Sequence, residues 1–241
     1  MITLAVDSTA KIAACAVARD EQILASFRCD NGLTQSELLL PMAEAVMQEA
    51  GLSYADVDLF ACTAGPGSFT GVRIGVAMIK GLAFGRNAAC VGVSTLEALA
   101  QNLFPLTGIY CPVMDARRGQ VYNALFRAED GNLVRLTPDR AISIADLAAE
   151  LRTSYPDSTV LLCGDGVDVV RDSADTEGIS LGEVPSLLLG QNADSVIRCA
   201  LRAYRRCECV DDASLRPTYL RLPQAERERL EREKKAIDAE K

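Results

Sequence analysis

The chain has 241 residues, of which 49% are hydrophobic and 24% charged, a composition typical of one large or two small globular domains. The sequence contains no histidine, which excludes Ser-His and Cys-His catalytic pairs and every metal site that depends on histidine. The formal net charge is −8, and no basic stripe precedes the C-terminal tail. We therefore expect the isolated chain to bind nucleic acid weakly, because unaided binding usually needs a basic surface.

The nine cysteines are odd in number, and many lie in apolar, strand-like runs where free cysteine behaves as a small hydrophobic residue. The N-terminus lacks the basic-then-apolar pattern of a signal peptide, and no apolar stretch approaches the roughly 20 residues that span a bilayer. We expect a cytoplasmic protein with reduced thiols and no membrane segment. Cys207 and Cys209 are the only close pair, and without a second pair they do not predict a metal site.

Three short apolar runs with turns between them predict a meander of strands over residues 2–8, 12–18 and 22–28. A helix is predicted over residues 35–49, because Thr34 and Glu37 fit the T-x-x-E capping box. Pro41 removes one helical hydrogen bond and is expected to bend the first turns. Residues 57–64 then have the pattern of a buried strand that leads into a glycine-rich turn.

Residues 64–85 are the most informative stretch of the sequence: a strand end, a Gly-Pro-Gly turn and a helix rich in small residues. Gly65 and Gly67 permit backbone angles that a side chain would forbid. Ser68 or Thr70 can cap the helix by accepting a hydrogen bond from an unpaired N–H group. The stretch predicts a tight turn followed by a helix.

The glycines inside this helix need a physical reason, because each costs about 1 kcal/mol relative to alanine. They are Gly71, Gly75 and Gly81. The simplest reason is that another backbone approaches the helix closely. Two interpretations are open: the helix packs on the sheet of its own domain, or it forms part of a docking face for another protein.

The rest of the chain is also predicted to alternate between strands and helices. A strand over residues 88–94 and a helix over 94–104 complete the first half. Further strands are predicted over 109–115, 119–126, 132–138 and 159–165, and further helices over 142–152 and 185–206.

Three strands, helix, strand and helix thus occur twice, which predicts a duplicated α/β fold of two βββαβα lobes. The expected lobes are residues 1–105 and 106–222, with Asp7 and Asp115 in matching places. Residues 223–241 form a charged tail with acid–base pairs at helical spacing. A solvated or frayed helix is expected there, with a partner-binding helix as the alternative.

Five motifs carry a resemblance to a known family. In chain order they are LAVDSTAKIAACAV (4–17), QSELLLP (35–41), GPGSFTGVRIG (65–75), MDARRGQVYNALF (114–126) and RPTYLRLPQAE (216–226). In these motifs the chain resembles the bacterial TsaB (YeaZ) family, although Gln35 stands where members often have histidine. The resemblance implies an actin-like, sugar-kinase-like (ASKHA) fold. It also implies a non-catalytic subunit that binds and activates the TsaD-type enzyme, which forms N6-threonylcarbamoyladenosine next to the anticodon of tRNA.

The resemblance further implies a nucleotide cleft between the lobes, with ATP or ADP and Mg²⁺ in that cleft or at a complex interface, and no tightly bound cofactor. Asp7, Ser8 and Thr9 match the first phosphate position and Asp115 the second. For the first group, a strand that ends in an Asx or Ser/Thr turn is the alternative. The Gly-Asp-Gly of residues 164–166 is interpreted either as a remnant of an adenosine loop or as an ordinary tight turn. We expect little or no ATP hydrolysis, because the sequence identifies only part of the machinery that phosphoryl transfer needs.

For the docking interpretation, the resemblance implies that the first two helices of the N-terminal half pair with the TsaD-type partner or with a second copy. The residues expected at this interface are Leu38, Leu39, Met42, Val46, Gly71, Arg73, Gly75, Met78 and Leu82. A TsaE-type ATPase is expected in the same assembly, and tRNA is expected to bind only through the complex. The sequence assigns no catalytic residue, and the alternative function is an ATP-dependent small-molecule kinase of the same superfold.

Overall fold

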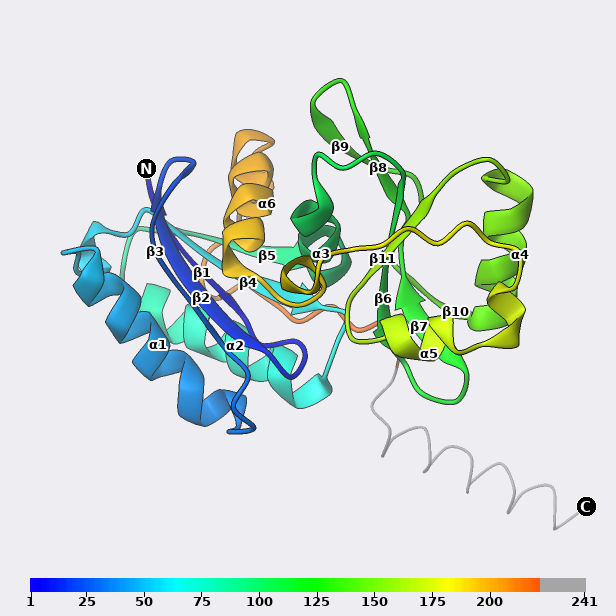
Figure 1. Ribbon diagram of the computed structural model, residues 1–241. Coiled ribbons are helices and arrows are strands. Elements are labelled where there is room, and N and C mark those ends of the chain that lie inside the picture. The colour runs from blue at the N-terminus through cyan, green and yellow to red at the C-terminus, as the bar shows by residue number, and fades with distance from the viewer. Residues whose placement is uncertain (222–241) are drawn as a thin grey trace, which may run out of the picture.

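A five-stranded sheet forms the N-terminal lobe of the computed structural model, which describes residues 1–221 (Figure 1). Its strands are β1 (Ile2–Asp7), β2 (Ala13–Arg19), β3 (Gln22–Cys29), β4 (Leu59–Gly65) and β5 (Ala89–Ser94), in the order β3-β2-β1-β4-β5. The first three strands form the predicted antiparallel meander, and β1, β4 and β5 run parallel to one another. The tail predicted for residues 223–241 lies outside the described residues.

Helices cover both faces of this sheet. On one face lie α1 (Gln35–Glu49) and α2 (Phe69–Ala83), which share an apolar core with β1, β2 and β4 (Figure 1). The predicted capping box of α1 is confirmed, because the Glu37 carboxylate accepts hydrogen bonds from Thr34 N (2.9 Å) and Thr34 Oγ1 (2.6 Å). Of the two residues predicted to cap α2, Ser68 is the N-cap in the structure, and its Oγ accepts a hydrogen bond from Gly71 N.

The opposite face of the N-terminal sheet is covered by α6 (Ala193–Arg205). This helix is shorter than the predicted helix 185–206, because Asn192 caps it by accepting a hydrogen bond from Asp194 N. The residues before it form the 3-10 turn Ser186–Leu188. Although α6 follows the second lobe in sequence, Val196, Ile197 and Ala200 are fully buried in a core shared with the first sheet. The last helix of the predicted lobe 106–222 thus packs on the sheet of the first lobe.

The second lobe is built around β6 (Ile109–Asp115), which pairs with three other strands. The remaining strands are β7 (Gln120–Asn123), β8 (Phe126–Glu129), β9 (Asn132–Arg135), β10 (Arg140–Ser143) and β11 (Val160–Cys163). The predicted strand 119–126 was wrong as one unit: it breaks at Ala124 and Leu125, since Leu125 N donates to Thr137 Oγ1 (2.8 Å) instead of continuing one ladder. Five strands rather than three thus precede the next helix.

The helices α4 (Ile144–Ser154) and α5 (Val167–Arg171) belong to the second lobe, and α3 (Thr95–Leu103) lies between the two sheets (Figure 1). Short 3-10 turns are found at Tyr54–Asp56 and Ala174–Thr176. Asn102 of α3 is buried and joins three parts of the molecule: Nδ2 donates to the carbonyl oxygens of Leu188 and Gly190, and Oδ1 accepts from Ser195 Oγ. No helix within residues 1–221 combines the length and the apolar run that a bilayer crossing requires.

Candidate functional site

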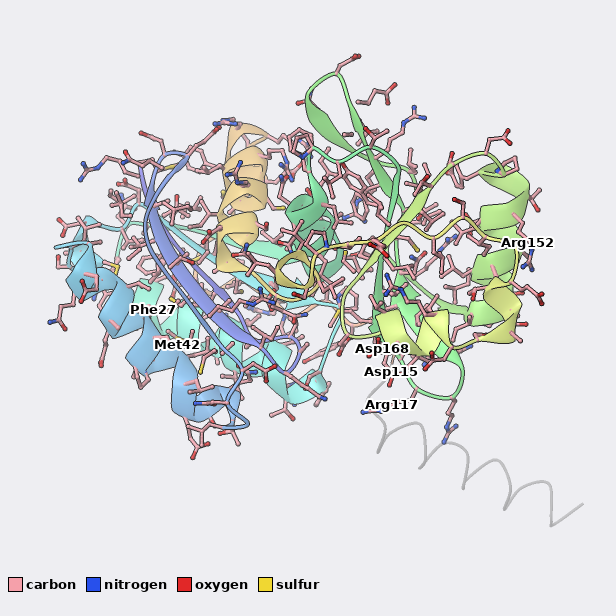
Figure 2. The ribbon with its side chains drawn as sticks, viewed as in Figure 1. Phe27, Met42, Asp115, Arg117, Arg152 and Asp168 are labelled. Atoms are coloured by element: carbon pink, nitrogen blue, oxygen red, sulfur yellow. The ribbon has the colours of Figure 1, made fainter. Side chains whose placement is uncertain are left out.

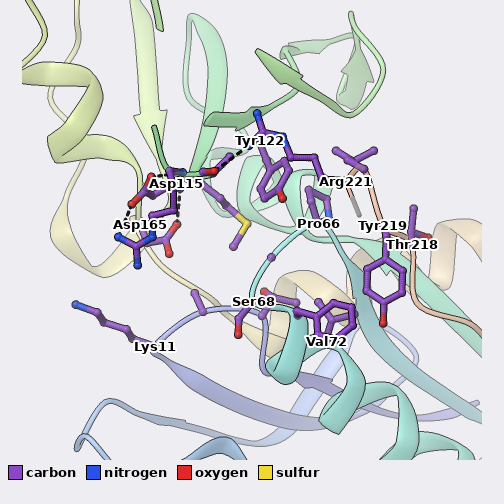
Figure 3. Close-up of a pocket in the computed structure, with 18 residues that line it drawn as sticks. Lys11, Pro66, Ser68, Val72, Asp115, Tyr122, Asp165, Thr218, Tyr219 and Arg221 are labelled. Carbon is purple, nitrogen blue, oxygen red and sulfur yellow. Dashed lines mark hydrogen bonds and ion pairs between the residues drawn. The ribbon is translucent and has the colours of Figure 1, made fainter. Parts of the chain in front are cut away.

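A cavity of about 520 Å³ lies between the lobes, where β1, β4 and β6 end (Figure 3). Its walls come from the β1–β2 turn, the Gly-Pro-Gly turn before α2, the β6–β7 turn and residues 218–221. Three cationic side chains and two carboxylates line it: Lys11, Arg117, Arg221, Asp115 and Asp165. The cavity is thus a polar cleft in which charges of both signs meet.

Two of the three predicted phosphate residues of the first turn, Asp7 and Ser8, make their contacts inside the protein and do not line this cavity. Asp7 is 1% exposed, and its Oδ1 accepts hydrogen bonds from Thr9 N (2.9 Å) and Thr9 Oγ1 (2.6 Å). Burial raises the pKa of the Asp7 carboxyl in spite of these bonds. Ser8 is also buried and donates its hydroxyl to Gly71 O (2.8 Å). Of the three residues only Thr9 lines the cavity, and the alternative of an Asx turn describes the geometry.

Asp115 repeats this turn in the second lobe. Its Oδ1 accepts from the backbone N of Arg117 (2.7 Å), as Asp7 accepts from the residue two positions on. Unlike Asp7, Asp115 is half-buried and lines the cavity. Its other oxygen, Oδ2, pairs with Arg117 Nη1 at 3.0 Å, and both residues lie at the end of the second lobe, away from Met42 in α1 (Figure 2).

Asp165 is a cavity residue that sequence reasoning placed only in a weak Gly-Asp-Gly motif. Its Oδ1 accepts from Asp115 N at 3.3 Å (Figure 3). Partial enclosure by protein atoms raises the pKa of Asp165, and the nearby Asp115 carboxylate raises it further. The flanking glycines allow this loop to lie against β6: a Cβ at Gly164 would come within 2.2 Å of Val113 O, and one at Gly166 within 3.1 Å of Asp115 N. An ordinary tight turn therefore accounts for the motif.

A similarly close contact with a neighbouring segment explains two of the three glycines in α2. A Cβ on Gly71 would lie 2.0 Å from Ser8 O, and a Cβ on Gly75 would lie 2.5 Å from Ser8 Oγ. Both glycines are buried by the protein's own β1–β2 turn. Of the two interpretations of this helix, packing within the domain holds for Gly71 and Gly75, and they are not available as contact residues for a partner. A Cβ on Gly81, in contrast, would meet no atom of residues 1–221 within 4 Å.

The other residues expected at the interface divide into two groups. Leu39, Met42 and Val46 of α1 are buried in the core under the N-terminal sheet, so the structure assigns them to packing. Leu38, Met78 and Leu82 rest on the same core but remain half-exposed, and Arg73 is exposed. These four lie where a second protein can reach them.

A C-terminal strap, residues 210–221, closes one side of the cavity. It begins at a β-bridge between Val210 and Cys90, and Leu215 inserts into the core beneath α2. Thr218 N then donates to Ala64 O (2.7 Å), so closely that a Cβ on Gly65 would come within 2.3 Å of Thr218 O. The sequence motif RPTYLR lies in this strap. Because it is far from the glycine turn in the sequence, the contact between the two could not be predicted from the sequence alone.

The end of the strap reaches the second lobe. Arg221 Nη1 donates to Ala116 O at 2.9 Å, and its guanidinium lies 5.7 Å from the ring centre of Tyr122. Lys80 of α2 holds the start of the strap by donating to the carbonyl oxygens of Ala213 and Leu215. The strap therefore fixes the glycine turn, α2 and the second lobe relative to one another.

These residues do not fit a Mg²⁺–nucleotide site of the phosphoryl-transfer type, which needs positioned metal, phosphate and a base together. Asp7 Oδ1 and Ser8 Oγ make hydrogen bonds inside the protein, and Asp115 is already paired with Arg117. Among residues 1–221, no three carboxylate, cysteine or histidine side chains are grouped as metal ligands.

Comparison with known proteins agrees with the sequence motifs. Residues 34–197 match the family model described as "TsaD: tRNA N6-adenosine threonylcarbamoyltransferase". The chain is 30% identical to the tRNA threonylcarbamoyladenosine biosynthesis protein TsaB of Bacillus subtilis, over 97% of this chain and 100% of the relative. It is likewise 30% identical to the TsaB protein of Escherichia coli, over 92% of this chain and 95% of the relative.

The fold has a close counterpart among solved structures. YeaZ from Pseudomonas aeruginosa superposes with a TM-score of 0.74 at 23% identity, over 91% of this chain and 99% of that one. The predicted actin-like, sugar-kinase-like α/β fold is thereby confirmed. The chain belongs to the TsaB (YeaZ) family and takes part in the biosynthesis of threonylcarbamoyladenosine in tRNA.

Proposed function

We propose that the chain is a non-catalytic subunit that binds and activates a TsaD-type threonylcarbamoyl-transferase. Family membership supports the pathway, and the lack of any histidine together with the inward-facing Asp7 and Ser8 supports a subunit without its own chemistry. The assembly would act in the cytoplasm, include a TsaE-type ATPase, and supply the tRNA contact that a chain of net charge −8 lacks.

The observation that carries the proposal is the outer face of α2. Thr70, Ala77 and Gly81 share its most exposed stripe, at i, i+7 and i+11. Beside them lies a half-buried apolar row formed by Leu38 of α1 and by Ile74, Met78 and Leu82 of α2. We call these seven residues the docking face. Within the part of the chain that the structure describes, Gly81 makes no contact that requires glycine, although glycine in a helix costs about 1 kcal/mol.

A flat apolar row beside a stripe of small side chains suits the close packing of a helix pair from another subunit. The TsaD-type enzyme is the proposed occupant, because the family model for that enzyme matches most of this chain and implies a related helix pair. Two copies of the chain would pair through the same face when the partner is absent, since such a contact is self-complementary about a two-fold axis.

The test is to mix the purified chain with the TsaD-type and TsaE-type proteins and to measure complex mass and threonylcarbamoyladenosine formation on tRNA. We expect a mixed complex to form and tRNA modification to depend on this chain. Modification at the same rate without the chain, or no complex with either protein, would contradict the proposal.

The alternative of a small-molecule kinase predicts ATP turnover by the isolated chain, whereas our proposal predicts none. Kinases turn over at about 1–100 per second, so an assay sensitive to about 0.01 per second separates the two. We propose that the isolated chain holds no nucleotide tightly, and that ATP or ADP with Mg²⁺ belongs to the assembled complex. Turnover near 1 per second by the pure protein would establish the alternative.

A further inference from the structure

Arg73 is an exposed cation near the docking face that two aromatic rings and one hydrogen bond hold in place. Its guanidinium carbon lies 3.8 Å from the ring centre of Phe69, one turn earlier on α2, and 5.7 Å from that of Tyr219 in the C-terminal strap. The two rings pack with centroids 5.0 Å apart. Arg73 Nε donates to Tyr219 Oη at 2.7 Å. Helix and strap together therefore fix the plane of the guanidinium.

The rest of the guanidinium is available for binding. Within residues 1–221 its two Nη groups make no hydrogen bond, and no carboxylate pairs with Arg73. The side chain is nevertheless exposed and always charged. A planar guanidinium with its orientation already fixed loses little freedom on binding an oxyanion through two parallel N–H groups.

The position of Arg73 on the surface indicates which kind of anion it can bind. Phe69 and Tyr219 line the cavity, whereas Arg73 is exposed on α2 and is not among the cavity-lining residues. On α2 it is next to the exposed stripe of Thr70 and Ala77. The net charge of −8 opposes approach of a polyanion such as RNA, but it opposes a single carboxylate within a protein interface much less.

We propose that Arg73, held by Phe69 and Tyr219, is a preformed receptor for an aspartate or glutamate side chain of the partner subunit, at the rim of the docking face. The inference rests on the proposed function. It also makes the C-terminal strap part of partner recognition, because Tyr219 positions Arg73 although the two are 146 residues apart in the sequence.

The experiment measures the dissociation constant of the complex with the TsaD-type protein for wild type, Arg73→Gln and Tyr219→Phe, at low and high salt. We expect Arg73→Gln to weaken binding about 10-fold or more, with a shallower salt dependence than wild type, since one interfacial charge pair is lost. Tyr219→Phe keeps the ring and removes only the hydroxyl, and it should weaken binding about threefold by loosening Arg73. Added to Arg73→Gln, it should have no further effect, because the two act as one unit.

Controls separate this inference from the proposed function. Both side chains are exposed, so melting temperatures should stay at the wild-type value, and Arg73→Lys, which keeps the charge without the planar fork, should restore binding only in part. If wild type forms no complex, the proposed function fails. If wild type binds and Arg73→Gln binds equally well, only the carboxylate receptor fails. RNA binding by the isolated chain that disappears in Arg73→Gln, with partner affinity unchanged, would identify a phosphate receptor and overturn the inference.

Discussion

Replacing Gly71 by alanine is expected to lower the free energy of unfolding by about 2–3 kcal/mol, the usual upper range for overpacking a buried site. The new Cβ would lie 2.0 Å from Ser8 O, which is backbone at the end of β1 and has no room to withdraw. Ser8 is buried, and its hydroxyl donates to Gly71 O at 2.8 Å, so α2 cannot shift without losing that bond. For a chain of this size the melting temperature should fall by roughly 4–12 °C.

Gly81→Ala is the matched control, because it makes the same substitution in the same helix but at an exposed position. At Gly81 the new Cβ meets nothing within 4 Å, so only the helix propensity changes and stability should rise by about 1 kcal/mol. The expected rise in melting temperature is roughly 2–4 °C. Thermal unfolding followed by circular dichroism measures both variants. Changes of the same sign in the two proteins would mean that Ser8 does not dictate the glycine at position 71.

The features that the sequence predicted correctly are those determined by residues close together in the chain. The meander of β1 to β3 follows from short apolar runs, and the start of α1 from the spacing of Thr34 and Glu37. Because the Gly-Pro-Gly turn and the following helix are encoded within one continuous stretch, their order was predictable from turn chemistry alone. The five motifs, spread over the chain, then led to the fold.

The features that the sequence did not predict depend on residues far apart in the chain. The glycines of α2 showed that something approaches closely, but not that it is Ser8, 63 residues earlier. The break between β7 and β8 comes from Thr137, which pairs with Leu125 and leaves no local pattern. Periodicity likewise identified α6 as a helix without showing that it packs on the first sheet. The cavity lies among five separated segments, so Asp165, Tyr219 and the strap could not be joined to it from sequence.

Gly81→Leu is expected to weaken binding of the TsaD-type partner by about 100-fold or more, while the monomer keeps its wild-type melting temperature or exceeds it. The expectation rests on the docking face: four added carbon atoms would project from the C-terminal end of a stripe in which Thr70, Ala77 and Gly81 are all small. Interfaces of this kind are packed as tightly as protein interiors, and an inserted side chain costs several kcal/mol unless the partner withdraws. Among residues 1–221, no atom lies within 4 Å of the position that the leucine Cβ would take.

Ala149→Leu supplies the control, because it adds the same aliphatic bulk to an exposed position of α4 in the second lobe. It should leave both partner affinity and tRNA modification unchanged. Sedimentation velocity on the mixture, with the modification assay beside it, distinguishes the outcomes. Since Gly81→Ala adds only one methyl group, its affinity should lie between wild type and Gly81→Leu, and this graded loss is what close approach of a second backbone predicts. Equal affinity across all three side chains at position 81 would place the partner elsewhere on the surface, and the exposed glycine would then have no structural explanation.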